Sequence, residues 1–234
     1  MRRGPAGSSL LERVACIPRP APPGRLAEEA LSAGCRLVEL RLDILGYSRA
    51  EARQALERLS PHGVRVIATL RDAGEGGRYS GPAEEKLETL LYMLDHGAWL
   101  IDVEYRFPLL DEALRQAPGR VLASIHDFRW TPPPEVLYSY AGDMLRRGAA
   151  VAKIATMARS LGDNWRILGV NARWPGRVAA FAMGRRGRLS RILAPLIGGA
   201  LTYASLGDPV APGQLSLEEL LEAWRLMGVL GEEA

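Results

Sequence analysis

Eight short apolar runs, rich in β-branched residues, recur along the chain and constrain its fold more than any other feature. Their starts are about 20 to 35 residues apart, which is the length of a strand, a helix and two loops. Apolar residues dominate both faces of the runs, as in parallel strands that are covered on both sides. The runs cover residues 14–17, 36–43, 64–71, 99–105, 120–126, 149–156, 177–183 and 199–205.

The segments between these runs carry helical signals. Ser48 with Glu51, and Ser216 with Glu219, have the spacing of capping boxes, in which each side chain bonds the other residue's backbone N–H. Gly97 follows leucines at helical spacing and predicts the end of another helix. Strands therefore alternate with helices throughout.

Eight alternating units without a linker predict an α/β chain, a single closed (β/α)8 TIM barrel. The expected catalytic domain spans residues 1–234, with residues 1–12 as a flexible N-terminal extension. At 234 residues and 47% hydrophobic composition, the chain has the size and apolar content of one such barrel. A doubly wound open sheet is the alternative, and it is disfavoured because no GxGxxG follows the first run.

Charge and hydropathy exclude several classes of protein. The net charge is +3, and no run of five or six like charges suggests nucleic-acid binding. No apolar segment approaches a membrane span, and the N-terminus lacks the apolar core of a signal peptide, so we expect a cytoplasmic protein. Cys16 and Cys35 are expected to be two reduced, buried thiols.

Lysine is rare in this chain and its two positions differ in character. Of the 30 basic residues, only Lys86 and Lys153 are lysines. Lys86 lies in the polar stretch AEEKLE, and we expect it to occupy a solvated helix position. Lys153 lies inside the apolar run 149–156, where an unpaired ammonium is costly. A desolvated lysine near other cations is largely neutral, and is then nucleophilic toward a carbonyl carbon.

Charged residues also collect toward the ends of several runs. Glu39, Arg41 and Asp43 end one run at a spacing of two, which places them on one side of a strand. Arg71 and His126 end two others. In a barrel, the carboxyl ends of the strands meet at one mouth, where active sites are built.

Each of these residues also has a structural interpretation. Glu39 and Arg41 could form an ion pair inside the barrel, Asp43 could cap a turn, and His126 could be a core histidine. The same holds for four further positions: Arg71 and Glu75 could be solvated, Asp102 and Glu104 are expected to be structural, and Met183 could belong to the core. The residue types together indicate an imine-forming lyase or aldolase acting on an anionic substrate, because guanidinium groups bind carboxylates.

Seven segments, taken in order, resemble type I 3-dehydroquinate dehydratase. The resemblance extends from about residue 13 to residue 228, and the order of the motifs makes it specific. The segments are VELRLD (38–43), TLRDAGEGG (69–77), IDVEY (101–105), SIHDF (124–128), AKIATMA (152–158), FAMGRRGRLSR (181–191) and APGQLS (211–216).

The resemblance implies a (β/α)8 barrel that dehydrates 3-dehydroquinate to 3-dehydroshikimate in the shikimate pathway. Lys153 would form the Schiff base, His126 would act as general base and then acid, and Glu75 would orient His126. The implied substrate-binding residues are Glu39, Arg41, Arg71, Arg191, Gln214, Met183 and Tyr203.

The resemblance also implies that no metal and no organic cofactor is needed, and that the enzyme is a homodimer. One departure is Val210, where the family usually carries serine or threonine, so a hydroxyl contact to the substrate is lost or replaced by backbone. The competing hypotheses are a class I aldolase, which would share Lys153, and a basic nucleic-acid-binding module, which the 6% aromatic content disfavours.

Overall fold

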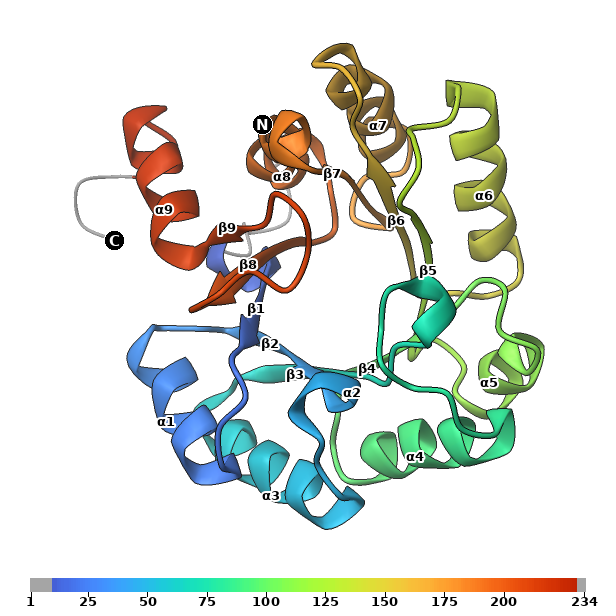
Figure 1. Cartoon of the computed structure of the whole chain (residues 1–234), viewed down its shortest axis with the longest axis vertical. Helices are drawn as coiled ribbons and strands as arrows, with labels where there is room; N and C mark the ends of the chain where they lie inside the picture. The colour runs from blue at the N-terminus through green and yellow to red at the C-terminus, as the bar shows by residue number, and fades with distance from the viewer. Residues whose placement is uncertain (1–9, 231–234) are drawn as a thin grey trace, which may run out of the picture.

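The computed structural model describes residues 10–230, and every predicted run contains a strand. All pairings are parallel, in the order β7-β6-β5-β4-β3-β2-β1-β8-β9. The strands surround a central axis and the helices lie outside them, so the predicted α/β barrel is confirmed (Figure 1). The strands are β1 (Val14–Pro18), β2 (Leu37–Arg41), β3 (Arg65–Thr69), β4 (Leu100–Glu104), β5 (Val121–Asp127), β6 (Val151–Met157), β7 (Val178–Met183), β8 (Thr202–Leu206) and β9 (Leu215–Ser216).

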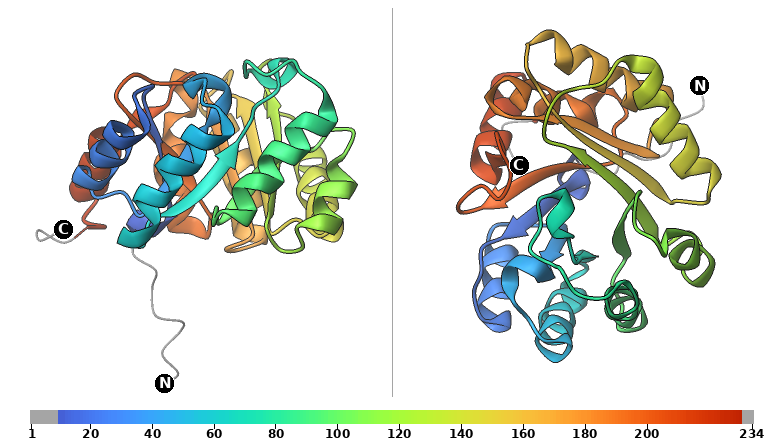
Figure 2. Two further views of the ribbon diagram at one scale, coloured as in Figure 1. Left: turned by 90° about the horizontal axis from the view of Figure 1, so that it is seen from below. Right: turned by 45° about the vertical axis from the view of Figure 1, so that its right-hand side comes forward.

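The helices alternate with the strands and cover their outer faces (Figure 2). Both predicted capping boxes are present: Ser48 with Glu51 begins α3, and Ser216 with Glu219 begins α9. The helices are α1 (Pro23–Ser32), α2 (Leu42–Leu45), α3 (Arg49–Leu59), α4 (Ala83–Asp95), α5 (Leu110–Gln116), α6 (Pro134–Arg146), α7 (Gly162–Arg173), α8 (Arg188–Leu193) and α9 (Leu217–Leu226). Short 3-10 turns are η1 (Leu10–Arg13), η2 (Ser60–His62), η3 (Ala73–Glu75), η4 (Arg185–Gly187) and η5 (Ala194–Ile197).

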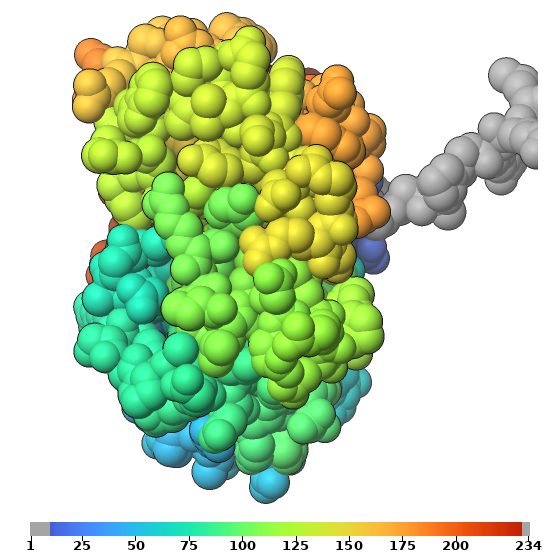
Figure 3. Space-filling view, turned by 90° about the vertical axis from the view of Figure 1, so that its right-hand side faces the viewer, coloured from blue at the N-terminus to red at the C-terminus, as the bar shows by residue number. Residues whose placement is uncertain are grey.

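Successive strand residues point alternately into the barrel and out toward the helices, which gives two apolar layers. In β6, Val151 and Ala155 belong to the inner cluster, whereas Ala152 and Ile154 belong to the outer one. The outer cluster is the larger, and α4, α5 and α6 close one side of it (Figure 3). Lys153 has the same parity as Val151 and Ala155, so it points into the barrel.

The seam between β7 and β8 closes with little backbone pairing. The Ala200 N–H donates to the carbonyl oxygen of Val178 at 2.7 Å near the amino ends of these strands. Higher in the barrel, the rings of Phe181 and Tyr203 pack across the seam with their centroids 5.4 Å apart. The seam is therefore filled largely by side chains, two of which reach the mouth of the barrel.

The first described residues form the short turn η1, which directly precedes β1. Residues 1–9 of the expected N-terminal extension lie outside the described residues, and residues 10–12 form most of η1. Arg65 donates to the Glu12 carbonyl oxygen at 2.6 Å, which ties this turn to β3. Within residues 10–230, no helix is long and apolar enough to cross a bilayer.

The expectation that Cys16 and Cys35 are reduced thiols is wrong in the structure, where they form a disulfide. Both side chains are buried, as expected. Cys16 lies in β1 and Cys35 immediately precedes β2, and these two strands are neighbours in the sheet. Parallel pairing therefore brings together two residues that are 19 positions apart in the sequence.

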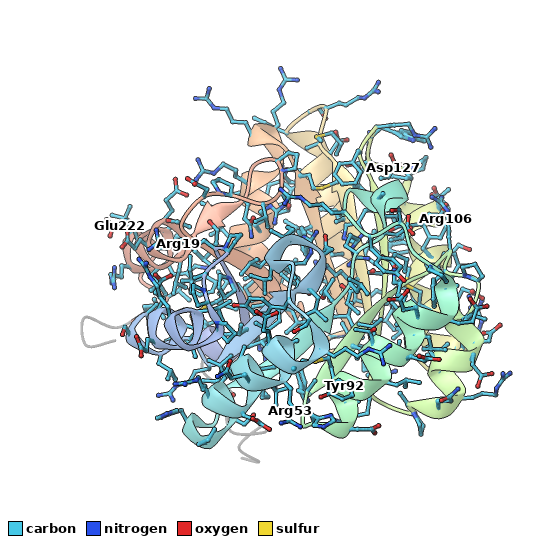
Figure 4. The ribbon with its side chains drawn as sticks, turned by 60° about the horizontal axis from the view of Figure 1, so that its bottom comes forward. Arg19, Arg53, Tyr92, Arg106, Asp127 and Glu222 are labelled. Carbon is cyan, nitrogen blue, oxygen red and sulfur yellow. A yellow bond between two sulfur atoms is a disulfide. The ribbon has the colours of Figure 1, made fainter. Side chains whose placement is uncertain are left out.

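The expectation that Lys86 is solvated is also wrong. Its side chain lies on the inner face of α4 and is only 1% exposed. The ammonium is 2.5 Å from an oxygen of Glu104, which compensates its charge in the interior. By contrast, Arg53 and Tyr92, on α3 and α4, lie at the outer edge of the molecule (Figure 4).

Candidate active site

All ten residues predicted for the site line a single pocket at the carboxyl ends of the strands. They come from β2, β5, β6, β7, β8, helix α8 and the loops that follow β3 and β8. The predicted residues are Glu39, Arg41, Arg71, Glu75, His126, Lys153, Met183, Arg191, Tyr203 and Gln214, and Phe181 and Val210 add apolar surface. The barrel therefore brings together side chains that are up to 175 positions apart, from Glu39 to Gln214.

Lys153 is buried in this pocket, and its amine is paired with two carboxylates. Its Nζ lies 3.0 Å from Oδ2 of Asp102 and 3.3 Å from Oε1 of Glu39. The ring of Tyr203 lies 4.2 Å from Nζ and presents its face to the amine. The expectation of an unpaired ammonium is therefore wrong, because two carboxylates hold the amine in place, whereas Arg71 lies nearby and contacts the same oxygen of Asp102.

Asp102 is the site residue that sequence reasoning missed, because it was assigned a structural role. It contacts Lys153 directly, accepts a hydrogen bond from Ser124 at 2.6 Å and pairs with Arg71 at 2.6 Å. Burial alone would raise the pKa of Asp102, but the charges of Arg71 and Lys153 hold it well below its usual range. Two carboxylates at a spacing of two in the buried strand segment IDVEY were the signal that could have identified it.

Arg71 is already saturated with acceptors, although the resemblance assigns it to the wall around the substrate. Its guanidinium contacts Asp102, the Ser124 hydroxyl at 2.8 Å and Glu104 at 3.1 Å. Arg41 is similarly paired, since it donates twice to Asp43 at 2.9 and 2.8 Å. Asp43 lies in α2 rather than in β2, so it does not share the strand face with Glu39 as the spacing suggested.

His126 and Glu75 form a pair beside Lys153. Oε2 of Glu75 lies 3.0 Å from Nδ1 of His126 and also accepts its backbone N–H at 3.1 Å. Burial raises the pKa of Glu75 to about 7, and the nearby charge of Arg71 opposes this effect. Burial, with the charges of Arg71 and Lys153, lowers the pKa of His126 well below its ordinary value. The imidazole is therefore neutral at neutral pH.

The glycine-rich loop 72–81 folds back on itself and so brings Glu75 to His126. Ala73 and Tyr79 are joined by a 2.8 Å backbone hydrogen bond, and the Gly77 N–H donates to the Asp72 carbonyl oxygen at 2.9 Å. A Cβ at Gly77 would lie 2.0 Å from the Arg71 carbonyl oxygen, so only glycine fits there. This tertiary arrangement explains why Glu75 looks like a solvated loop residue in the sequence.

Within residues 10–230, every buried side-chain polar atom without a hydrogen-bond partner belongs to a residue of this pocket. They are Oε1 of Glu75, Nε and one terminal nitrogen of Arg191, the Tyr203 hydroxyl and Nε2 of Gln214. Buried polar groups are normally paired, so this concentration marks a place where a polar ligand completes the hydrogen bonding.

Arg191 is the strongest of these signals. Its guanidinium is 1% exposed, lies 4.6 Å from the ring of Phe181, and has no acidic partner among the described residues. Burial lowers the pKa of Arg191 to about 10, which still leaves it charged at neutral pH. An uncompensated buried guanidinium favours a bound carboxylate.

The loop after β8 covers the other side of the pocket. Oε1 of Gln214 accepts the Val210 backbone N–H at 2.9 Å, which leaves the amide nitrogen of Gln214 directed at the pocket residues. The Gly184 N–H donates to the Pro212 carbonyl oxygen at 2.9 Å and fixes the loop against the end of β7. Val210 thus contributes a backbone donor to its own loop and an apolar side chain to the pocket.

Metal-ligating residues do not gather here: within residues 10–230, no group of three or more His, Cys, Asp or Glu side chains could hold a metal ion. The chemistry that the pocket offers is that of an amine between two carboxylates, a neutral imidazole paired with a carboxylate, and an unpaired guanidinium.

Comparisons with known proteins show the family of this chain. The family model described as type I 3-dehydroquinase matches residues 23–231. The 3-dehydroquinate dehydratase of Dehalococcoides mccartyi is 39% identical over 199 residues, covering 83% of this chain and 87% of the relative. That of Pyrococcus abyssi is 37% identical over 205 residues, covering 86% and 92%.

Solved structures show the same fold. The crystal structure of 3-dehydroquinate dehydratase from Geobacillus kaustophilus superposes with a TM-score of 0.82 at 23% identity, covering 94% of this chain and 93% of that one. The enzyme from Aquifex aeolicus gives a TM-score of 0.79 at 28% identity, covering 93% and 100%. The family predicted from the ordered motifs is confirmed: the chain belongs to the type I 3-dehydroquinases, which are hydro-lyases.

Proposed function

We propose that this protein dehydrates 3-dehydroquinate to 3-dehydroshikimate, a step of the shikimate pathway, through a Schiff base on Lys153. One observation carries the proposal: an amine, an imidazole paired with a carboxylate and an unpaired buried guanidinium line the same pocket. These are the groups needed to form an imine, to move a proton, and to hold the carboxylate of a small anionic substrate.

Lys153 forms the imine with the C3 ketone. Its nitrogen attacks the carbonyl carbon, the carbonyl oxygen leaves as water, and the nitrogen becomes an iminium. The two protons that the nitrogen gives up are transferred to the departing oxygen, while Asp102 and Glu39, at 3.0 and 3.3 Å from Nζ, stay ionised and stabilise the positive charge of the iminium. The Tyr203 face, 4.2 Å from Nζ, favours that same cation.

His126 carries out the two proton transfers of the elimination. Its Nε2 removes a proton from C2, whose electrons are drawn into the iminium and form an enamine. The enamine then expels the C1 hydroxyl, to which the imidazolium returns the proton, so that water leaves on the same face. Hydrolysis of the remaining imine releases the product and restores the Lys153 amine.

Glu75 sets the tautomer of His126 that this sequence requires. The ionised carboxylate accepts the Nδ1 proton at 3.0 Å, which leaves the Nε2 lone pair free to act as the base. A protonated Glu75 would instead donate to Nδ1 and place the imidazole proton on Nε2, where it blocks catalysis. The rate is therefore expected to depend on ionisation of Glu75.

The remaining pocket residues bind and orient the substrate. Arg191 and Gln214 have free donors for its carboxylate and a hydroxyl, and Met183 and Tyr203 form the walls of the ring site. Glu39, Arg41 and Arg71 supply the polar wall around the ring hydroxyls. Because Arg71 is held by two carboxylates, its main contribution is to hold Asp102 beside the iminium.

Borohydride trapping tests the proposal directly. Reduction in the presence of 3-dehydroquinate should add the mass of a ligand to the peptide that contains Lys153, and none to the peptide that contains Lys86. Lys153→Met is the matched control and should give no adduct and no ultraviolet absorbance of the conjugated product. His126→Ala should still form the adduct but release no product.

Two other outcomes would redirect the assignment. An adduct at Lys86 would remove Lys153 from the mechanism. An adduct at Lys153 with other keto acids, and no product from 3-dehydroquinate, would favour the class I aldolase.

The family resemblance also leads us to propose that residues 1–234 form one catalytic domain that assembles as a homodimer. Light scattering of the full chain coupled to size-exclusion chromatography should give about twice the chain mass of 25.5 kDa. A monomer mass would overturn the homodimer without affecting the proposed reaction.

A further inference from the structure

The two lysines of the chain are joined by one buried series of ion pairs. Each step between neighbouring charges is 3.1 Å or less. In spatial order, the members of this buried ion series are Lys86, Glu104, Arg71, Asp102 and Lys153. Lys86 does not line the catalytic pocket, and the proposed reaction does not use it.

The Lys86 ammonium is held by one carboxylate and lies close to two aromatic rings. Its ammonium lies 2.5 Å from Oε2 of Glu104 and 4.9 Å from the centre of the Phe107 ring, with the Tyr79 ring at 5.9 Å. At 1% exposure, such a charge is tolerated only with its partner present. Because burying an ammonium group is energetically unfavourable, we infer that Lys86 does more than pack α4 against the barrel.

Glu104 links Lys86 to the loop that carries Glu75, because its carboxylate contacts both. While Oε2 holds Lys86, Oε1 accepts the Asp72 backbone N–H at 2.9 Å and pairs with Arg71 at 3.1 Å. Asp72 begins the turn that ends at Glu75, and its carboxylate caps that turn by accepting the Gly74 N–H at 2.7 Å. Glu104 thus holds the start of the loop through the Asp72 backbone, and Lys86 fixes the orientation of the Glu104 carboxylate.

We propose that Lys86 is a positioning residue of the active site, which holds Glu104 and thereby keeps Glu75 correctly placed and charged beside His126. This inference rests on the proposed function, because it concerns the proton transfers assigned to His126. It assigns a role in the reaction to a helix residue that contacts neither the pocket nor the substrate.

The charge of Lys86 is expected to lower the pKa of Glu75 by neutralising Glu104. The charge of Glu104 raises the pKa of Glu75, and Asp102 adds to the effect, whereas Arg71 and the His126 backbone N–H oppose it. Lys86 neutralises Glu104 from the opposite side. Arg106 and Asp72 are the other charged residues that line the cavity shared by Glu75 and Glu104, and Arg106 extends to the rim of the molecule (Figure 4). Loss of Lys86 therefore leaves more negative charge facing Glu75 and raises its pKa further.

The pH dependence of turnover tests the inference. In Lys86→Met, we expect the low-pH limb of kcat to move about one unit to higher pH, which lowers kcat about tenfold on that limb with little change in KM. Lys86→Arg restores the charge and should return the limb toward its wild-type position. If Lys86→Met does not fold, Lys86→Gln, which can donate to Glu104 without a charge, makes the same comparison.

A matched variant separates positioning from stability. Met93 is buried on the same helix, and Met93→Ala should lower the melting temperature without moving the limb. In a Glu104→Gln background, Lys86→Met should cause no further shift, because its target charge is gone. A wild-type pH profile in Lys86→Met, or a shift of equal size in Met93→Ala, would overturn the inference.

The trapping experiment distinguishes failure of this inference from failure of the proposed function. Lys86→Met should still give the borohydride adduct at Lys153. If wild-type protein gives no adduct, the proposed function fails. If wild type is trapped and the pH profile does not depend on Lys86, only the positioning role fails.

Discussion

Some residues of the pocket have a role in the proposed reaction but lower the stability of the folded protein. Glu75 and Arg191 are both buried, and for both of them burial opposes the charged form. A substitution that removes such a charge should therefore lower activity and raise stability together. This opposite response separates them from residues that only support the fold.

Glu75 should control the low-pH limb of the reaction. Its pKa of about 7 predicts that kcat rises with pH through this value, as Glu75 loses its proton and fixes the Nδ1–H tautomer of His126. Glu75→Gln should lower kcat by about tenfold to a hundredfold and remove that limb. A pH profile with the limb unchanged in Glu75→Gln would exclude this role.

Glu75→Gln should raise the stability of the folded protein, although it lowers activity. The pKa of Glu75 is raised on folding, so its ionisation costs stability, and that cost develops as pH rises from about 4.5 toward about 7. Above this range, Glu75→Gln should melt at a higher temperature than wild type. Below about pH 4, the two melting temperatures should converge, because Glu75 is then protonated in both the folded and the unfolded chain.

Arg191 should matter for binding rather than for the chemical step. Arg191→Met removes the donor for the substrate carboxylate, and we expect KM to rise about a hundredfold with a smaller change in kcat. The melting temperature of the free protein should not fall, because the substitution removes an uncompensated buried charge. A lowered melting temperature with an unchanged KM would show that Arg191 is structural.

At the scale of elements, the main links are those that join neighbouring strands and loops. The Cys16–Cys35 disulfide joins β1 to the start of β2 at the beginning of the barrel, and Glu104 joins β4 to the loop after β3. Both links lie between elements that are adjacent in the sheet, so each restrains one unit of the barrel against the next.

The disulfide should contribute to thermal stability. Closing a loop of this length stabilises a fold by about 3 kcal/mol, so reduction should lower the melting temperature by about 10 °C. The double variant Cys16→Ala, Cys35→Ala should melt lower than oxidised wild type and should not respond to reductant. Two free thiols per chain in denatured, unreduced wild type would show that the bond is absent.

Much of this element structure follows from local pattern. The eight strands and both capping boxes lie where the periodicity and the Ser–Glu spacing predict them. β9 was not predicted, because two residues are too few to show a period. Asp43 was assigned to a strand face but lies in α2, since the backbone turns immediately after Arg41.

At the scale of the whole molecule, the barrel interior is polar at one end and apolar at the other. Leu37, Leu100 and Leu122 fill the amino end, while the carboxyl end carries the buried ion series and the pocket. Acidic and basic groups alternate along the series, so each buried charge has an opposite neighbour. Arg191, outside this series, is the cation whose partner the substrate supplies in our proposal.

The sequence alone determined the order of strands and helices, and the placing of Lys153 and His126 on successive strands toward one mouth of the barrel. These properties depend on local periodicity and on the rule that parallel strands end at one face. The family motifs added Glu75, which no local pattern distinguishes from a solvated loop residue.

Only the tertiary structure decided which side chains meet across elements. It placed Asp102 against Lys153, buried Lys86 against Glu104, and paired Cys16 with Cys35, each against the expectation from sequence. The physical reason is that period and composition specify a residue's face on its own element. The distance to a residue on another element depends on sheet register, loop closure and the curvature of the barrel.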